Sequence, residues 1–119
     1  MFAAFNGGDV RVLHDLIAED AVWRVPGNTL VSRTYDGRRE IFELFRETRA
    51  LTDGTYRSEL RWAAADGDNA VAVYRARGTR LGREIDIDQV LLIGLRDGRW
   101  QQVLALPTDP PAFEAFWGE

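Results

Sequence analysis

The chain has 119 residues, of which 45% are hydrophobic and 29% charged, and its formal net charge is −4. This length and balance are typical of one globular domain, and no apolar run approaches the ~20 residues that a membrane-spanning helix needs. The chain has no cysteine, and its 15 basic residues are all arginine. Disulfides, thiolate catalysis, zinc–thiolate sites and Schiff-base chemistry on lysine are therefore excluded.

The charge pattern gives no sign of a nucleic-acid or membrane surface. The arginines are scattered among 19 acidic residues, without a basic stripe that carries interleaved aromatic side chains. We therefore expect no nucleic-acid partner. The N-terminus has no basic region followed by an apolar run, so we recognise no signal peptide and expect a cytoplasmic protein without membrane contact.

The first half of the chain is predicted to be mainly helical. Residues 1–6 are typical of the end of a helix, and Asp9 is a suitable N-cap for a second, amphipathic helix that reaches Ile17. A short strand over 20–25 follows and ends at a Pro-Gly pair, and residues 28–36 are predicted to form a polar loop.

The clearest helix is predicted from Gly37 to about Leu51, where an Asp-Gly pair stops it. Its apolar residues recur at helical spacing and define the face expected to be buried. They are Ile41, Phe42, Leu44, Phe45 and Thr48.

From residue 55 onward the apolar residues follow the two-residue period of β-strands. Strands are predicted over 55–65, 70–79, 84–95 and 100–106, joined by tight turns, and a short helix over 109–117 ends the chain. The predicted order is two helices, a strand, a long helix and a four-stranded antiparallel meander. Strands of this length must twist and coil, so helices on the concave side leave a conical space.

Five short segments resemble, in their order along the chain, the SnoaL-like, ketosteroid isomerase-like branch of the nuclear transport factor 2-like superfamily. They are Asn6-Gly7-Gly8-Asp9, residues 23–27, Tyr35-Asp36-Gly37-Arg38, Arg96-Asp97-Gly98-Arg99 and Pro107-Thr108-Asp109. The resemblance implies one domain over residues 1–119 and an α+β fold: a cone-shaped, curved antiparallel sheet wrapped around N-terminal helices (a cystatin-like α+β barrel). It also implies a pocket inside the cone for a small hydrophobic molecule, with no cofactor and no metal.

The same resemblance argues against ketosteroid isomerase chemistry. By position, the tyrosine that stabilises the oxyanion falls at Met1, the catalytic base at Val25, and the protonated aspartate near Leu91. Valine cannot take up a proton, and leucine cannot donate a hydrogen bond to an oxyanion.

Two other residues are the candidate catalytic groups. Arg75 matches the arginine of the family's limonene epoxide hydrolases, although Arg77, two residues on, is not the acid that those enzymes have. Asp109 is the acid in the terminal region that comes nearest to the pocket aspartate of SnoaL-type cyclases. Arg75 would polarise a carbonyl oxygen and Asp109 would act as base. The alternative for Arg75 is a salt bridge to Asp86 or Asp88 on the next predicted strand.

The candidate ligand-binding residues are Trp23, Val25, Tyr56, Gln89 and Leu91. Trp23 is equally typical of a hydrophobic core, and Tyr56 of an ordinary strand. Glu84, Asp86 and Asp88 share one strand face, where cross-strand pairing with Arg75, Arg77 and Arg80 is favoured over a site for a hard cation.

The last two predicted strands are apolar on both faces, as at Val90 to Ile93 and Val103 to Leu106. An antiparallel sheet with one face in water should alternate, so both faces call for cover. We therefore predict a homodimer through the outer sheet face. Two functions remain open: a cofactor-free enzyme that uses acid/base chemistry on a small carbonyl compound, and a non-catalytic dimeric protein that binds a hydrophobic ligand or a partner chain.

Overall fold

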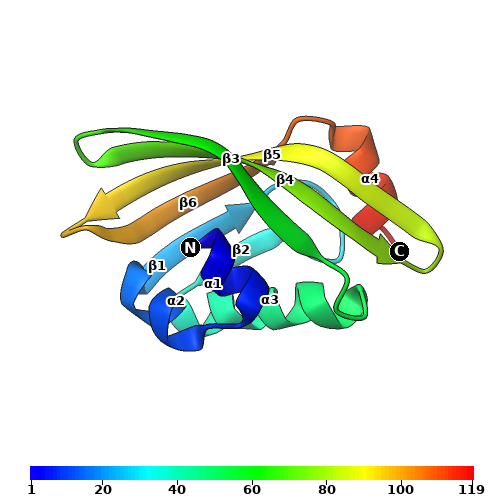
Figure 1. Ribbon diagram of the computed structural model, residues 1–119, viewed down its shortest axis with the longest axis horizontal. Coiled ribbons are helices and arrows are strands. Elements are labelled where there is room, and N and C mark those ends of the chain that lie inside the picture. Colours follow the sequence, from blue (N-terminus) through cyan, green and yellow to red (C-terminus); the bar gives the residue numbers. More distant parts are fainter.

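The computed structural model describes the backbone of residues 1–119 and the side chains of residue 1 and residues 5–119. Four helices and six strands form a curved sheet with helices on its concave side (Figure 1). The helices are α1 (Phe2–Gly7), α2 (Val10–Leu16), α3 (Arg38–Leu51) and α4 (Pro110–Trp117). The strands are β1 (Ile17–Val25), β2 (Arg33–Asp36), β3 (Arg57–Asp66), β4 (Asn69–Arg80), β5 (Arg83–Arg96) and β6 (Arg99–Pro107).

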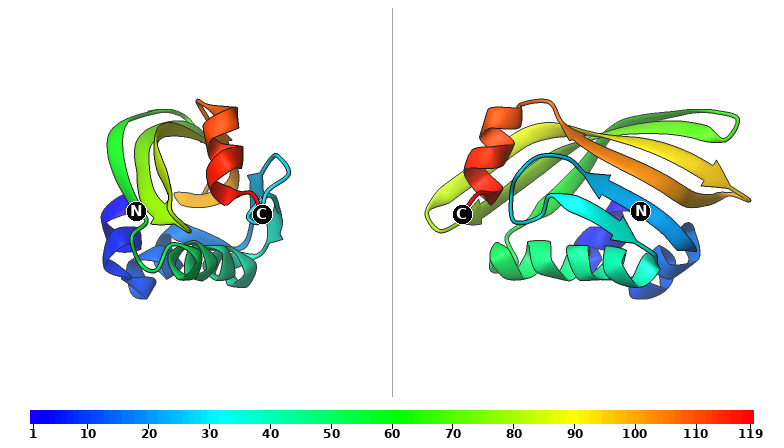
Figure 2. Two further views of the ribbon diagram at one scale, coloured as in Figure 1. Left: turned by 90° about the vertical axis from the view of Figure 1, so that its right-hand side faces the viewer. Right: turned by 180° about the vertical axis from the view of Figure 1, so that it is seen from behind.

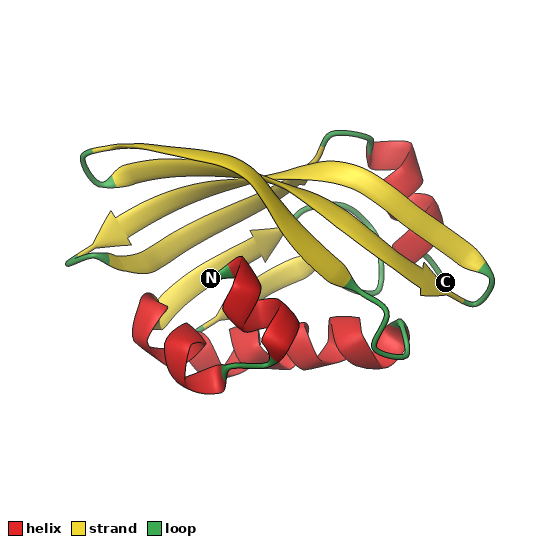
Figure 3. Ribbon diagram, in the orientation of Figure 1, coloured by secondary structure: helices red, strands yellow, loops and turns green.

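The six strands form one sheet in the order β2-β1-β6-β5-β4-β3. All neighbours are antiparallel except β1 and β6, which run parallel. Seen end-on in the left panel of Figure 2, the long strands arch over α3, and α4 lies at one side of the arch. Figure 3 shows the same separation of helices from strands. The predicted α+β fold with a curved sheet is confirmed.

The first two strands differ from the sequence-based prediction. β1 begins at Ile17, three residues earlier than expected, and residues 33–36 form β2 instead of a polar loop. Strand β2 has a single inward residue, Tyr35, which is fully buried and donates from its hydroxyl to the Val31 carbonyl at 2.8 Å. Because so short an edge strand buries only one side chain, its sequence looks like a loop.

The hairpins occur where the sequence predicts them. Leu81 and Gly82 between β4 and β5 both have positive φ, at 51° and 76°, as a type I′ turn requires. On β4 itself, Gly78 allows a close approach of the chain, because a Cβ there would lie 3.3 Å from the Cα of Tyr56.

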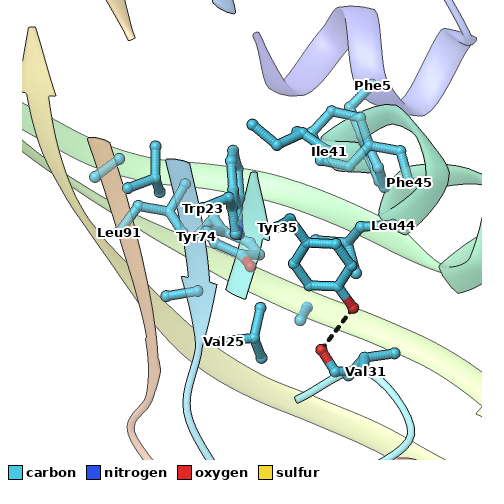
Figure 4. Close-up of a cluster of buried hydrophobic side chains, with 14 of the residues drawn as sticks. Phe5, Trp23, Val25, Val31, Tyr35, Ile41, Leu44, Phe45, Tyr74 and Leu91 are labelled. Carbon is cyan, nitrogen blue, oxygen red and sulfur yellow. Dashed lines mark hydrogen bonds between the residues drawn. The ribbon is translucent and has the colours of Figure 1, made fainter. Parts of the chain in front are cut away.

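The predicted face of α3 is buried against the concave side of the sheet. Ile41, Leu44, Phe45 and Thr48 are buried, while Phe42 is partly covered. The Phe45 ring meets Trp23 of β1 edge-on, with ring centroids 5.4 Å apart (Figure 4). No helix among the described residues is long and apolar enough to cross a membrane.

The open edge of β3 is partly occupied by a side chain of α1. The Asn6 amide donates to the Ser58 carbonyl at 2.6 Å, and its oxygen accepts from the Ser58 backbone N–H at 2.9 Å. This side chain therefore pairs with the strand backbone as a neighbouring strand would, and it fixes α1 to the sheet.

Candidate functional site

A hollow lies on the concave side of the sheet, between β1, β3, β4, β5 and β6 on one side and α1, α3 and α4 on the other. Its enclosed space measures about 70 Å³, and the whole hollow, counted out to solvent at its open end, measures about 600 Å³. Most of its wall is carbon, and Figure 4 shows part of that wall. The apolar lining residues are Met1, Phe5, Trp23, Val25, Val31, Leu44, Phe45, Leu91, Ala105, Phe113 and Trp117.

One part of the wall is polar. Ser58, Tyr74 and Gln89 come from three adjacent strands, and Tyr56 immediately precedes the first of these strands. Tyr74 and Gln89 are direct cross-strand partners. Tyr56 is the centre of this group, because Tyr74, Ser58 and Gln89 are the side chains that act on its phenol. We call these four residues the polar cluster.

Both tyrosines of the polar cluster keep their protons. Burial raises the pKa of Tyr56, although its three side-chain hydrogen bonds lower it in part. Burial, and then the neighbouring Tyr56, raise the pKa of Tyr74 well above its usual value. At neutral pH these phenols can therefore donate hydrogen bonds to an oxygen, but they cannot act as bases.

The described lining includes no carboxylate, imidazole, guanidinium or ammonium side chain. General acid/base catalysis near neutral pH uses a group that titrates in that range. The described residues also contain no cluster of three or more histidine or acidic side chains that could hold a metal ion. As it stands, the lining is suited to binding an uncharged molecule.

All five predicted ligand-binding residues line this hollow. Trp23, Val25, Tyr56, Gln89 and Leu91 come from separate parts of the chain, and the curved sheet brings them together. Trp23 belongs to the core as well as to the lining, since it is 5% exposed. The positions to which the resemblance assigns isomerase chemistry, Met1, Val25 and Leu91, surround the same space.

The two predicted catalytic residues lie elsewhere. Arg75 points to the convex side of β4, where its Nε lies 2.7 Å from Asp86 Oδ1 and its Nη1 lies 3.4 Å from Asp88 Oδ1. Asp109 is exposed at the start of α4 and accepts from the backbone N–H of Ala112 at 3.2 Å, as an N-cap. The structure thus separates both residues from the hollow. For Arg75 it shows the alternative salt bridge.

The acidic face of β5 pairs across strands at Asp86 and Asp88, as favoured, whereas Glu84 forms no ion pair with the described residues. Asp86 binds Arg77 as well as Arg75, and Asp88 binds Arg61 of β3. Arg80 was expected to join these pairs, and this expectation is wrong. It lies at the end of β4, where its side chain turns inward to the end of α4.

Sequence reasoning missed two members of the polar cluster, Ser58 and Tyr74. Both could have been found from the strand period, because Ser58 of β3 follows Tyr56 by two residues. Tyr74 lies between Ala72 and Ala76, which are both buried on the same face of β4. As a catalytic candidate, Arg75 was expected to reach the pocket, but the structure shows its alternative salt bridge, and the neighbouring Tyr74 has the inward position.

Comparisons with known proteins agree with this geometry. A family model described as the SnoaL-like domain matches residues 1–103. The uncharacterised protein Rv0034 of Mycobacterium tuberculosis (strain H37Rv) is 32% identical over 117 residues, which are 98% of this chain and 89% of the relative.

Two solved structures illustrate the similarity in fold. Bal32a, from a soil-derived mobile gene cassette, is 28% identical with a TM-score of 0.94, and the match covers 98% of this chain and 89% of Bal32a. A loop-truncation variant of IdmH is 26% identical with a TM-score of 0.75, over 98% of this chain and 93% of the variant. Wild-type IdmH, from Streptomyces antibioticus, is described as a proposed polyketide cyclase.

Proposed function

Because this chain belongs to the SnoaL-like domain family, we propose that it binds a small, uncharged, largely apolar molecule inside the curved sheet. The ligand carries at least one oxygen, which the polar cluster of Tyr56, Ser58, Tyr74 and Gln89 holds by hydrogen bonds. The rest of the ligand lies against the carbon wall.

The contrast between the two parts of the wall carries this proposal. Ligand sites are commonly apolar with a few polar groups that fix orientation, and the hollow has this composition. An anionic or cationic ligand would be buried without an opposite charge, which is costly. A neutral ring with one hydroxyl or carbonyl group avoids this cost of burying a charge.

The size of the hollow limits the ligand. The enclosed space of about 70 Å³ is smaller than the engineered cavity of roughly 150 Å³ that takes up benzene. A single ring therefore requires some lining side chains to move, and the flexible Met1 side chain at the wall is suited to this. A large polycyclic molecule requires a wider opening.

A cyclase activity is the second candidate, and two observations favour it. One is the likeness to IdmH. The other is the buried phenol of Tyr56, which would donate a hydrogen bond to a carbonyl oxygen that gains negative charge, beside the phenol of Tyr74. The base of such a reaction is then water or the substrate itself, because Arg75 and Asp109 lie outside the hollow.

Phenol and toluene test the binding proposal, because they have nearly the same shape and differ in one hydroxyl group. Binding can be followed by ¹⁹F NMR of protein labelled with 5-fluorotryptophan, since Trp23 and Trp117 line the hollow. We expect the wild type to prefer phenol, after correction for the partition of both compounds from water. Tyr56→Phe should reduce that preference roughly 5- to 10-fold, the effect of one lost hydrogen bond.

Tyr35→Phe is the matched control, because Tyr35 is buried but bonds to Val31 and does not line the hollow. It should keep the wild-type preference for phenol. Equal preference in the wild type and Tyr56→Phe would contradict the proposal. Ligand-induced shifts confined to Trp62, on the convex face, would contradict it as well.

We also propose that two copies of this chain pair through the convex face of the sheet. Cross-strand partners there form an apolar grid, with Val73 beside Val90 and Val71 beside Leu92. Trp62 and Leu92 are 54% and 45% exposed in the single chain. The grid, which we call the outer apolar face, consists of Trp62, Val71, Val73, Val90, Leu92, Leu104 and Leu106.

A second copy is the occupant that fits this face best. The face is a contiguous apolar area of a kind that marks interaction sites, and the ion pairs of Arg75 with Asp86 and Asp88 lie at its border. Borders that carry both charges suit a face that meets its own copy, as a two-fold interface requires.

A further inference from the structure

A buried arginine holds the end of the helix that closes the hollow. Arg80, the last residue of β4, is 7% exposed, and its Nη1 donates to the carbonyl oxygens of Phe116 and Gly118, both at 2.8 Å. Helix ends leave such carbonyls without a partner in the helix, and their partial negative charge favours a cation. Arg80 therefore anchors the C-terminal end of α4 to the sheet, together with Arg83 of β5, whose Nη1 donates to the carbonyl oxygens of Ala115 at 3.2 Å and Gly118 at 2.9 Å.

The anchored end of α4 carries a residue of the cavity wall. Trp117, the last residue of α4, is 1% exposed and lines the hollow. Its carbonyl accepts from the Leu30 backbone N–H at 3.1 Å, and its ring meets Phe116 edge-on at 4.7 Å. The place of the Trp117 ring thus depends on where the helix end is held.

Trp117 in turn contacts the centre of the polar cluster. The rings of Trp117 and Tyr56 lie 5.6 Å apart between centroids. Behind Tyr56 the backbone of Gly78 leaves little space, so the ring is confined between β4 and Trp117. A shift of the helix end would therefore move the Tyr56 hydroxyl.

We propose that Arg80 is a positioning residue of the cavity. By fixing the end of α4, Arg80 fixes the Trp117 ring. The Trp117 ring in turn holds the Tyr56 hydroxyl at the place where it binds the ligand oxygen. This inference rests on the proposed function, because it concerns the same hydroxyl. Arg80 does not itself line the hollow, so its effect on ligand choice passes through Trp117.

The first test needs no ligand. In protein labelled with 5-fluorotryptophan, Arg80→Met is expected to shift the ¹⁹F resonance of Trp117 and to leave that of Trp62 in place. Arg39→Met is the matched control, because the Arg39 side chain is 92% exposed and should leave both resonances unchanged. An unchanged Trp117 resonance in Arg80→Met would overturn the proposal.

The second test measures the preference for phenol over toluene. Arg80→Met should reduce it roughly 3- to 10-fold, and Arg80→Lys, which restores a donor with charge, should recover part of it. In a Trp117→Phe background, Arg80→Met should add little, because both changes act on one contact. Independent, additive effects of the two changes would overturn the proposal.

The design separates the possible failures. If Arg80→Met does not fold, Arg80→Gln, which is shorter and uncharged but keeps a polar end, replaces it in both tests, and a Trp117 resonance that stays in place in that variant overturns the proposal. If the wild type shows no preference for phenol, the proposed function fails, while the ¹⁹F shift in ligand-free protein still decides whether Arg80 positions Trp117.

Discussion

The two tyrosines of the polar cluster make the stability of the protein depend on pH in the alkaline range. Burial raises the pKa of Tyr56 and Tyr74 above the usual value of 10.0. The unfolded chain therefore loses these protons first as pH rises. The stabilising effect is complete below pH 10, and it is lost as pH rises from there through the folded-state pKa values.

We expect the free energy of unfolding to fall steeply above about pH 10, and to fall less steeply in Tyr56→Phe and Tyr74→Phe, which cannot ionise. Urea denaturation at several pH values between about 8 and 11 measures this. A slope in both variants equal to that of the wild type would show that the buried phenols do not control the alkaline transition.

The sequence predicts on which face of the sheet a side chain lies where the two-residue period of the strand alone decides it. Gln89 and Leu91 alternate with Asp88 and Val90, and their inward position follows from this pattern. Arg75 was misplaced because its charge suggested chemistry, whereas its neighbour Tyr74 has the buried position. Asp109 precedes two prolines, a sequence typical of a helix N-cap. This pattern predicts a capping role for Asp109 in place of the role of a base.

Among the elements, β4 leaves little room for added volume at Gly78, where it meets Tyr56 just before β3. In Gly78→Ala, the new methyl group would lie 3.3 Å from the Tyr56 Cα and 3.4 Å from its ring. We expect a loss of about 1–3 kcal/mol in unfolding free energy from this overpacking, and a weaker preference for phenol. Thermal or urea unfolding and the ¹⁹F assay measure the two effects.

Gly7→Ala is the control for this change, because no heavy atom lies within 4 Å of a Cβ at Gly7, in α1. Alanine favours helix, so this variant should be as stable as the wild type or up to about 1 kcal/mol more stable. Equal stability of Gly78→Ala and the wild type would mean that β3 shifts freely against β4.

Long elements were predictable because each repeats its pattern over many residues, as α3 does with Ile41, Leu44, Phe45 and Thr48. Strand β2 was not predictable from the sequence, because four residues with one buried side chain are too few to show a two-residue period. Its position depends on pairing with β1, where Tyr35 lies opposite Trp23. Contacts between segments far apart in the sequence, such as Arg80 with the end of α4, leave no local pattern.

For the whole molecule, the outer apolar face predicts association. Leu92→Arg places a charge in the middle of this face and should convert a dimer to a monomer, measured by light scattering at micromolar concentration. Leu81→Arg is the matched control, because Leu81 is 80% exposed in the β4–β5 turn. It should leave the mass unchanged. A wild-type protein that is monomeric under these conditions would contradict the proposed pairing.

The amide of Asn6 has a consequence for how such molecules associate. A further strand added along β3 would have to displace this side chain from the Ser58 backbone, where both polar groups are already paired. Growth of the sheet from molecule to molecule would be open-ended and would lead to fibres, whereas pairing through a face closes after two copies. One asparagine on a six-residue helix thus favours a finite assembly over an endless one.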